Sequence, residues 1–248
     1  NGLPKINNWD NNLVMSFHKY WNYNDQASIS GMLNHRTSQN VPLWLGESGE
    51  NSNTWFANAI GLAENNNIGW SWWPFKKIDS RTGNLIVPKT EGYQQLLNYW
   101  EGNASKPSAN QALEWLLEQA DMLKLENCSV NYDVNDAMFR QAQGDKIPIQ
   151  FKQHQIPGNI FATDYDLGAN NYAYFDNDTA TYHSSSDEYT AWNQGYGYRN
   201  DGVDIEACTD NISNGYNVGW TQNGEWLLYT VDIDSTAAYS IDFRYAAN

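Results

Sequence analysis

Three short apolar runs near the amino end each stop at a cluster of aromatic and polar residues. The first cluster holds His18 and Tyr20, the second Glu47, and the third Trp72 and Trp73. Stretches with helical spacing separate the runs, and strands that alternate with helices form parallel sheets whose carboxyl ends meet at one edge. The pattern therefore predicts an α/β architecture that brings the clusters together.

The alternation assigns an element to most of the first 150 residues. Strands are expected at residues 13–20, 43–47 and 68–73, and helices at residues 29–35, 54–64, 93–100 and 134–142. A helix follows each strand, as in βα units with parallel strands.

A further helix is expected to begin at Ser108. Gln111 follows three positions later and completes a capping box behind Pro107. An apolar stripe at helical spacing comes next and is expected to dock on the barrel that such an alternation of strands and helices can form. Its members are Leu113, Leu116, Leu117, Ala120 and Leu123.

Side-chain alternation determines which of the clustered groups can meet. His18 and Tyr20 stand two positions apart and share one strand face, while Leu43, Leu45 and Glu47 share a face of the next strand. A carboxylate at the mouth of an apolar interior row is costly unless a phenol or an imidazole hydrogen-bonds it. We therefore expect Glu47 to be functional, with His18 and Tyr20 beside it.

Each of these residues also has a simpler interpretation. His18 alone is compatible with a structural histidine, and Glu47 alone could cap the following helix. Glu50 is expected to be a loop or first-turn acid, close to a helix that begins at Ser52 or Asn53. The functional interpretation depends on the combination of acid, imidazole, phenol and indole at successive strand ends.

The third cluster supplies aromatic surface. Trp70 and Trp72 share one face of the strand, Trp73 lies on the other, and Pro74 ends the ladder pattern. Aromatic rings stack on the apolar C–H faces of pyranose sugars, so Trp73 or Trp72 is expected to form the stacking platform of a sugar subsite. Ordinary packing in the core is the alternative for each of them.

These motifs closely resemble the last third of glycoside hydrolase family five, whose members are retaining enzymes on an eight-fold β/α barrel. The matching stretches are NLVMSFHKYW at residues 12–21, WLGESG at residues 44–49 and IGWSWWP at residues 68–74. The resemblance implies that residues 1–150 form an incomplete (β/α)8 TIM barrel, namely its last three βα units and trailing helices.

The resemblance also implies a role for each residue that matches by position. Glu47 would be the nucleophile, Tyr20 its hydrogen-bond partner, and His18 a residue that lines the site. Trp73 would be the aromatic platform at the eighth strand, with Trp72 as the alternative. The implied substrate is a β-glycan polysaccharide such as a β-glucan.

Half of the catalytic pair is missing from the pattern. Retaining hydrolysis needs two carboxyl groups roughly 5–5.5 Å apart, of which one is the acid/base. In the family that residue follows an Asn on the fourth strand, usually in an Asn-Glu-Pro triplet, and no such triplet occurs in this sequence. We therefore expect the chain to be a fragment whose first five βα units lie outside it, and which does not turn over substrate alone.

Composition narrows the class of partner. The 29 acidic residues against 14 Lys and Arg give a formal net charge of −15, which argues against a nucleic-acid partner. No apolar run is long enough to span a membrane. We expect a secreted, extracellular monomer whose signal sequence lies upstream.

The sequence shows no metal-binding pattern. Cys128 and Cys208 could form a disulfide, but the sequence does not decide whether they do. No cluster has metal-ligand spacing, and no cofactor is expected for catalysis.

The helical periodicity disappears in the last third of the chain. Short alternating runs at residues 160–165, 203–207, 218–222, 225–233 and 239–245 predict an all-β sandwich. Asn223 and Gly224 lie between two such runs and predict a type I′ hairpin that pairs Trp220 with Leu227. In that register Trp220 and Trp226 face opposite sides.

Residues 157–248 resemble a carbohydrate-binding module of family six, truncated at its carboxyl end. The matching stretches are PGNIFATDY at 157–165, GVDIE at 202–206, GYNVGW at 215–220, GEWLLY at 224–229 and AYSIDFRY at 238–245. The resemblance implies that Trp220 is one aromatic wall of a sugar-binding cleft and that Trp226 is core. Phe161 and Thr163 replace two Glu residues that help to hold a structural calcium in the family, which argues against calcium here.

Two functions of different class remain. In the first, the chain belongs to a retaining endo-β-glycanase, similar to a cellulase, whose appended module holds the polymer. In the second, the chain is a non-catalytic polysaccharide-binding protein. The presence of Glu47, His18 and Tyr20 favours the first.

Overall fold

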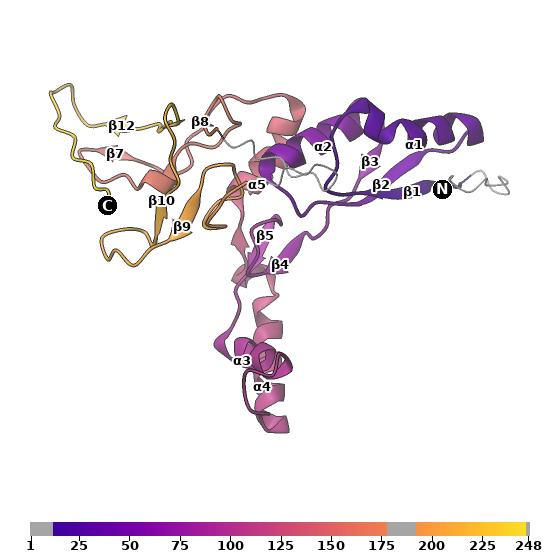
Figure 1. Cartoon of the computed structure of the whole chain (residues 1–248), viewed down its shortest axis with the longest axis horizontal. Coiled ribbons are helices and arrows are strands. Elements are labelled where there is room, and N and C mark those ends of the chain that lie inside the picture. Colours follow the sequence, from indigo (N-terminus) through magenta and orange to yellow (C-terminus); the bar gives the residue numbers. More distant parts are fainter. Residues whose placement is uncertain (1–11, 178–191, 247–248) are drawn as a thin grey trace.

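The structure is a computed structural model that describes residues 12–177 and 192–246. It combines helices and strands, and the strands are grouped in small sheets. Figure 1 shows an amino-terminal lobe, a carboxyl-terminal lobe beside it, and a pair of helices that projects away from both.

A parallel three-stranded sheet in the order β1–β2–β3 forms the base of the amino-terminal lobe. Its strands are β1 (Met15–Lys19), β2 (Leu43–Ser48) and β3 (Gly69–Trp70). The connecting helices are α1 (Gln26–Gln39) and α2 (Asn53–Asn65). The expected alternation of parallel strands and helices is confirmed here, although a closed barrel is not seen among the described residues.

Local capping signals begin and end these helices. The Asp25 side chain accepts a hydrogen bond from the Ser28 amide at 2.8 Å, and the Ser52 hydroxyl accepts one from the Trp55 amide at 3.1 Å. Both caps satisfy amide groups that have no partner within the helix. Asn40, in a left-handed conformation with φ of 52°, ends α1.

The two faces of the sheet differ in polarity. Helices α1 and α2 cover one face, whereas Ser16, His18 and Trp44 are exposed on the other. Burial of the apolar face drives the helices onto the sheet. The core residues on that face are Ile29, Leu43, Leu45, Ala63 and Ile68.

A second core lies on the far side of α2. Helix α5 (Tyr132–Phe139) packs there, and the short 3-10 helix η2 (Gln141–Gln143) follows it. The helix expected at residues 134–142 is therefore two shorter ones. The core consists of Trp55, Phe56, Ala59, Ile60, Val134 and Met138.

The projecting pair consists of α3 (Glu91–Trp100) and α4 (Ala109–Met122). Ser108 caps α4 by accepting a hydrogen bond from the Gln111 amide at 3.2 Å, which confirms the predicted start. A small sheet of β4 (Lys76–Ile78), β5 (Leu85–Val87) and β6 (Ser129–Val130) lies at the base of the pair, and the 3-10 helix η1 (Leu125–Asn127) follows α4.

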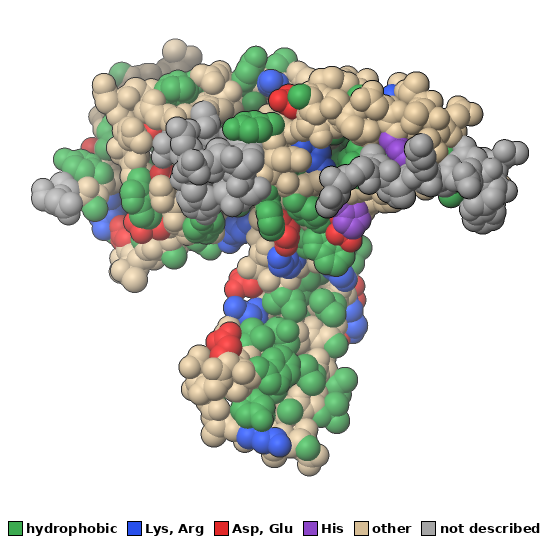
Figure 2. All heavy atoms as spheres, turned by 45° about the vertical axis from the view of Figure 1, so that its right-hand side comes forward, with side chains coloured by type: hydrophobic (Ala, Val, Ile, Leu, Met, Phe, Trp, Pro, Cys, Tyr) green, Lys and Arg blue, Asp and Glu red, His purple; other side chains and the backbone are tan. Residues whose placement is uncertain are grey.

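The expected docking of the α4 stripe on the barrel is wrong. Helix α4 packs on α3, where a Cβ added to Gly92 would lie 2.2 Å from Cδ1 of Trp115. Figure 2 shows hydrophobic side chains gathered over this projecting pair. Helical spacing determines which side chains share a face but not what the face meets. The exposed stripe is Leu113, Leu116, Leu117, Ala120 and Leu123.

The described residues of the carboxyl-terminal lobe form three two-stranded sheets. β8 pairs with β11 and β9 with β10 in antiparallel fashion, and β7 pairs with β12 in parallel. The strands are β7 (Gln155–Ile156), β8 (Tyr174–Phe175), β9 (Ile205–Ala207), β10 (Tyr216–Val218), β11 (Trp226–Leu227) and β12 (Asp232–Ile233). The lobe packs around Tyr165, Ala173, Tyr174, Val203 and Ile205.

The strands described in this lobe are shorter than the strands of the predicted sandwich. Residues 160–165, expected as a strand, contain the 3-10 helix η3 (Ala162–Asp164), and residues 239–245 have no strand. Alternation of apolar and polar residues permits a strand, but a strand also requires a neighbour that accepts its hydrogen bonds.

The predicted hairpin is also wrong. A turn spans residues 222–225, but β11 pairs with β8 instead of with β10. A type I′ turn needs positive φ at both central residues, and only Gly224, with φ of 97°, has it, whereas Asn223 does not. Trp226 is 41 % exposed and therefore does not belong to the core.

Candidate functional site

A register shift between β1 and β2 determines where the predicted carboxylate lies. Leu45 pairs with Phe17 but Glu47 pairs with His18, so Gly46 is the extra residue. Such a bulge changes the face to which the following side chains point. The expectation that Glu47 shares a face with Leu45 is therefore wrong, because Glu47 lies with His18 on the open face of the sheet.

The Glu47 carboxylate has two neighbours from the end of β1. The Tyr20 hydroxyl donates to Oε2 at 3.4 Å, and Nδ1 of His18 lies 3.4 Å from the same oxygen. The structure thus brings the three predicted residues together, and the Glu47 side chain remains 41 % exposed. Long contacts of this kind often tighten only when a substrate binds.

The chemistry of this trio follows from the state of Tyr20. Burial raises the pKa of Tyr20 to about 12, and the negative charges of Glu47 and Glu50 add to the effect. The phenol therefore keeps its proton near pH 7 and donates a hydrogen bond to the Glu47 carboxylate. A carboxylate oriented in this way can accept charge-assisted hydrogen bonds or attack an electrophilic carbon.

The loop after β2 turns sharply beside this carboxylate. Gly49 has φ of 140°, and a Cβ there would lie 2.2 Å from the Trp73 carbonyl oxygen. Glu50 has φ of 52°, which costs a non-glycine residue roughly 1–2 kcal/mol. The Trp21 indole, which donates to the Glu50 carbonyl at 2.9 Å, and Lys77, which pairs with its carboxylate at 2.7 Å, hold Glu50 in place.

The predicted sugar platforms differ in their surroundings. Trp73 is 52 % exposed, whereas Trp72 packs edge-on against Phe56 with ring centroids 5.0 Å apart. Trp44 is a further exposed indole on the open face, and it covers Gly69 so closely that a Cβ there would lie 2.4 Å from its ring. The sequence could have predicted this exposure, because Trp44 precedes the buried Leu45 and neighbouring strand residues point to opposite faces.

Sequence reasoning missed a buried cation on the helix side of the same strand ends. Lys19 is only 4 % exposed, and it donates to the Tyr23 carbonyl at 2.7 Å and to Oδ1 of Asn22. Its Nζ lies 5.5 Å from the ring centroid of Trp55. Burial lowers the pKa of Lys19 to about 8, and the attraction of Asp25 offsets only part of this effect. The position of Lys19 between His18 and Tyr20 was the available signal.

Two polar atoms close to the end of β2 are buried without a hydrogen-bond partner among the described residues. They are Oγ of Ser48 and Nε1 of Trp72. A buried unsatisfied polar group costs about 1–3 kcal/mol. Two further atoms of this kind, Oδ1 of Asn24 and Nε2 of His35 in α1, lie elsewhere in the same lobe.

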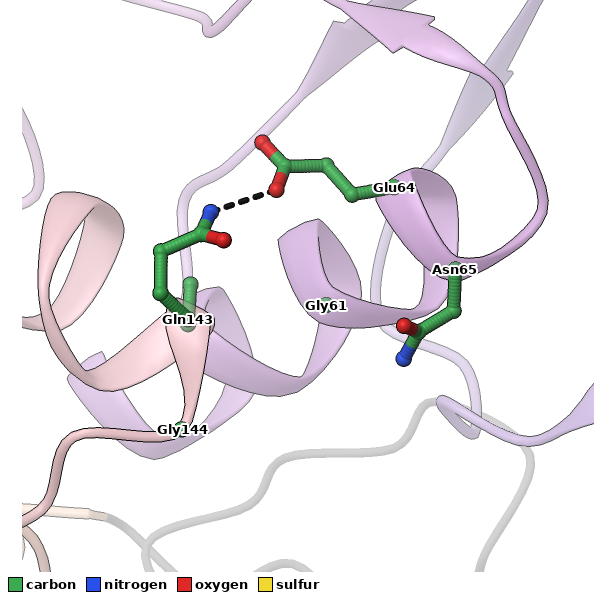
Figure 3. A pocket seen from close by; sticks show the side chains of 6 residues that line it. Gly61, Glu64, Asn65, Gln143 and Gly144 are labelled. Carbon is green, nitrogen blue, oxygen red and sulfur yellow. Dashed lines mark hydrogen bonds between the residues drawn. The ribbon is translucent and has the colours of Figure 1, made fainter.

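A pocket of about 410 Å³ lies between α2 and η2, and Figure 3 shows its lining. Glu64 and Gln143 point toward one another there, and Nε2 of Gln143 donates to Oε2 of Glu64. The Trp70 indole donates to the other Glu64 oxygen at 3.0 Å. Both carboxylate oxygens thus have partners, and none of the predicted site residues lines the pocket.

Within residues 12–177 and 192–246 there is no group of three or more His, Cys, Asp or Glu side chains that could hold a metal ion. Thr163, at one of the positions at issue for calcium, is buried, and its hydroxyl accepts a hydrogen bond from Asn214 at 2.9 Å. Cys128 and Cys208 are free thiols. In the described part of the chain, every helix is too short or too polar to cross a bilayer.

Exposed indoles are also present in the carboxyl-terminal lobe. Trp220 and Trp226 are both accessible, and Trp220 has a positive φ of 45° in the segment after β10. Aromatic side chains with one exposed face are suited to stacking on a ligand.

Comparison with known proteins identifies one part of the chain. Residues 196–248 match the carbohydrate binding module (family 6). No curated protein and no solved structure matches the chain. The matched segment contains Trp220 and Trp226 and supports carbohydrate as the kind of partner that the carboxyl-terminal lobe binds.

Proposed function

We propose that this chain binds a β-glycan through its carboxyl-terminal lobe and presents Glu47 as the nucleophile of a retaining glycoside hydrolase. The observation that carries the hydrolase part is the contact of one exposed carboxylate with Tyr20 and His18 on the open face of a parallel sheet. The match to a carbohydrate-binding module supports the binding part.

The proposal assigns β1, β2 and β3 to the last three strands of a (β/α)8 barrel. Helices cover one face of this sheet, and Glu47 and His18 stand at the carboxyl ends of their strands on the other. Barrel enzymes place their catalytic groups at this end. The proposal also makes the protein secreted and monomeric.

In the proposed reaction an oxygen of Glu47 attacks C1 of the sugar and forms a covalent glycosyl ester. A second carboxyl group protonates the departing oxygen, then takes a proton from the water that cleaves the ester. Tyr20 and His18 hold the Glu47 carboxylate in position through Oε2. Because the sequence has no Asn-Glu-Pro triplet, we propose that these residues alone do not hydrolyse a natural polysaccharide.

The exposed indoles would bind the polymer. Trp73, which pairs with Gly49 in an isolated bridge, is the platform next to the carboxylate, and Trp220 is the platform in the carboxyl-terminal lobe. Trp72 is the less suitable platform because it packs against the core.

A second candidate function is polysaccharide binding without catalysis. The match that favours it covers residues 196–248 and does not include Glu47. In that case Glu47 would still hydrogen-bond a sugar hydroxyl, and its replacement would weaken binding instead of removing a reaction.

Covalent trapping distinguishes the two functions. A 2-deoxy-2-fluoro-β-glycoside with a dinitrophenolate leaving group needs no acid catalyst for departure, so the nucleophile can be tested in this chain without the second carboxyl. We expect the mass of the peptide that contains Glu47 to increase by one fluorosugar. A family of such reagents, based on glucose, cellobiose, xylobiose and mannobiose, covers the substrate classes.

The matched control is Glu47→Gln, which keeps the shape of the side chain but removes the nucleophile. Labelling at another residue, or no labelling by any reagent in a chain that binds the corresponding polysaccharide, would support binding without catalysis. Binding is measured by affinity electrophoresis on soluble β-glucan, xylan and mannan, with Trp220→Ala as the variant expected to weaken retention.

A further inference from the structure

The carboxyl-terminal lobe contacts the loop that follows Glu47. That loop, residues 49–52, joins the end of β2 to the start of α2. Asn200 lies in the segment that matches a carbohydrate-binding module, and its Nδ2 donates to the carbonyl oxygen of Asn51 at 2.8 Å. A residue of one lobe thus holds the backbone of the other, four positions after the candidate nucleophile.

Asn200 uses all of its polar groups in this region. Nδ2 also donates to Oδ1 of Asn53 at 3.1 Å, and the Asn200 carbonyl accepts from the Asn53 amide at 3.0 Å. The Asn200 amide donates to Oδ2 of Asp133 at 2.7 Å, and Oδ1 accepts from the Trp192 indole at 3.1 Å. Asn51, Asn53 and Asn200 are buried, so water does not replace these bonds.

The residues on either side of Asn200 fix it in the carboxyl-terminal lobe. The guanidinium of Arg199 pairs with Asp201 at 2.6 Å and lies 3.9 Å from the ring centroid of Tyr165. Asp201 in turn accepts a hydrogen bond from Nδ2 of Asn53 at 2.8 Å. The segment whose amide side chain reaches Asn51 therefore has contacts in both lobes.

The loop itself needs such support. Glu50 occupies the left-handed region with a φ of 52°, where local preference alone does not keep a glutamate. On its amino side the loop is held by the Trp21 indole, which donates to the Glu50 carbonyl. On its carboxyl side the next carbonyl, that of Asn51, is held by Asn200.

We propose that Asn200 is a positioning residue of the candidate site. It fixes the loop so that Glu47 and Glu50 remain beside Tyr20, and the carbohydrate-binding segment is in this way part of the site. The effect on catalysis rests on the proposed function, whereas the effect on the loop does not need a substrate.

The test follows the loop directly. In ¹⁵N-labelled protein the Trp21 indole signal reports the bond to the Glu50 carbonyl, with Trp21→Phe for assignment. We expect Asn200→Ala to shift this signal and to increase amide exchange in residues 46–52 by about tenfold, because local opening becomes easier. The Trp226 indole signal should stay in place, since β11 lies outside the contact.

The matched control is Asn217→Ala. Asn217 also donates from a partly buried amide, to Glu206 at 3.2 Å, but entirely within the carboxyl-terminal lobe. It should change neither the Trp21 signal nor the exchange of residues 46–52. If Asn200→Ala does not fold, Asn200→Ser, which keeps the backbone bonds to Asp133 and Asn53, is measured in the same way.

A folded Asn200 variant with an unchanged Trp21 signal and unchanged exchange would overturn the proposal. Covalent labelling of Glu47 separates this result from the proposed function. Misplacement of a reacting group by about 1 Å costs roughly 100-fold in rate, so we expect Asn200→Ala to label about 100-fold more slowly than the parent chain. Loop changes without any labelling of the parent would support the positioning role and contradict the hydrolase. Labelling of Asn200→Ala at the parent rate, with an unchanged loop, would support the hydrolase and contradict the positioning role.

Discussion

Each lobe of the molecule buries a cation, and the two are held in opposite ways. Arg199 in the carboxyl-terminal lobe pairs with Asp201 and donates to the backbone carbonyl oxygens of Tyr165 and Asp166. Lys19 in the amino-terminal lobe donates to two neutral acceptors among the described residues, and burial lowers its pKa to about 8. A buried charge is tolerated when it is paired and is costly when it is not.

The difference shows where the molecule is stable and where it is constrained by a site. The junction between the lobes satisfies its buried polar groups, whereas the sheet end that presents Glu47 buries Lys19 next to Ser48, whose hydroxyl has no partner among the described residues. Groups that reduce local stability are common where a site is built. The comparison therefore supports the assignment of the β1–β2 end as the functional end of the sheet.

The largest expected effect comes from Arg199→Met. The substitution leaves Asp201 buried without its cation, and we expect the free energy of unfolding to fall by about 3–5 kcal/mol. Urea titration followed by tryptophan fluorescence measures it. The control is Arg244→Met, which breaks an exposed pair with Asp210 and should cost less than about 1 kcal/mol. Equal losses in the two variants would contradict the comparison.

Lys19→Met, in contrast, should raise the free energy of unfolding near pH 7, because it removes a cation whose burial is unfavourable. The folded pKa of Lys19 lies near 8 and its ordinary value is 10.5, so between these values the unfolded chain binds more protons and stability rises with pH. Relative to Lys19→Met, the parent chain should gain stability from pH 7 to pH 11, by at most about 3 kcal/mol. Parallel unfolding curves for the two proteins over this range would show that Lys19 is not strained by burial.

The titration of Tyr20 tests the site end more finely. Its folded pKa is raised to about 12, so the stabilisation of the neutral phenol is complete below pH 10 and is lost as the pH rises toward 12. In Glu47→Gln the pKa should fall, though not to 10, because burial is the largest cause. Absorbance at alkaline pH, taken as a difference from the matching Tyr20→Phe proteins, measures this. An unchanged titration would place Glu47 too far from Tyr20 to act with it.

The smallest effect is expected from Lys77→Met. The ion pair of Lys77 with Glu50 is substantially exposed, and such pairs contribute about 0–1 kcal/mol. Thermal unfolding at low and at high salt should hardly distinguish the variant from the parent. A loss above about 2 kcal/mol would mean that Glu50 depends on this pair for its left-handed conformation.

The parts of the fold that were predicted correctly depend on short-range signals. Ser108 and Gln111 specify the start of α4 by a cap that involves four residues, and the alternation of apolar runs locates β1 and β2. The meeting of Glu47, His18 and Tyr20 was predicted from their places at strand ends. These signals need no knowledge of distant parts of the chain.

The parts that were missed depend on distant contacts. The register of β1 against β2 determines the face on which Glu47 lies. The α4 stripe is exposed because it does not pack on the amino-terminal sheet. Asn200 stands in a polar stretch between Arg199 and Asp201 that looks like any solvated loop, and only the fold brings it to Asn51. Periodicity describes a segment, whereas these features belong to pairs of segments.

The bulge at Gly46 determines the face of the sheet on which Glu47 lies. In a regular strand of the same length, without the bulge, the acid would point inward on the face of Leu45, and Ser48 would point outward. Deletion of Gly46 would instead remove the bulge and leave the acid opposite His18 on the open face. A distant sequence that is one residue shorter at this point therefore still presents the acid, whereas one that replaces the bulge by a regular ladder does not.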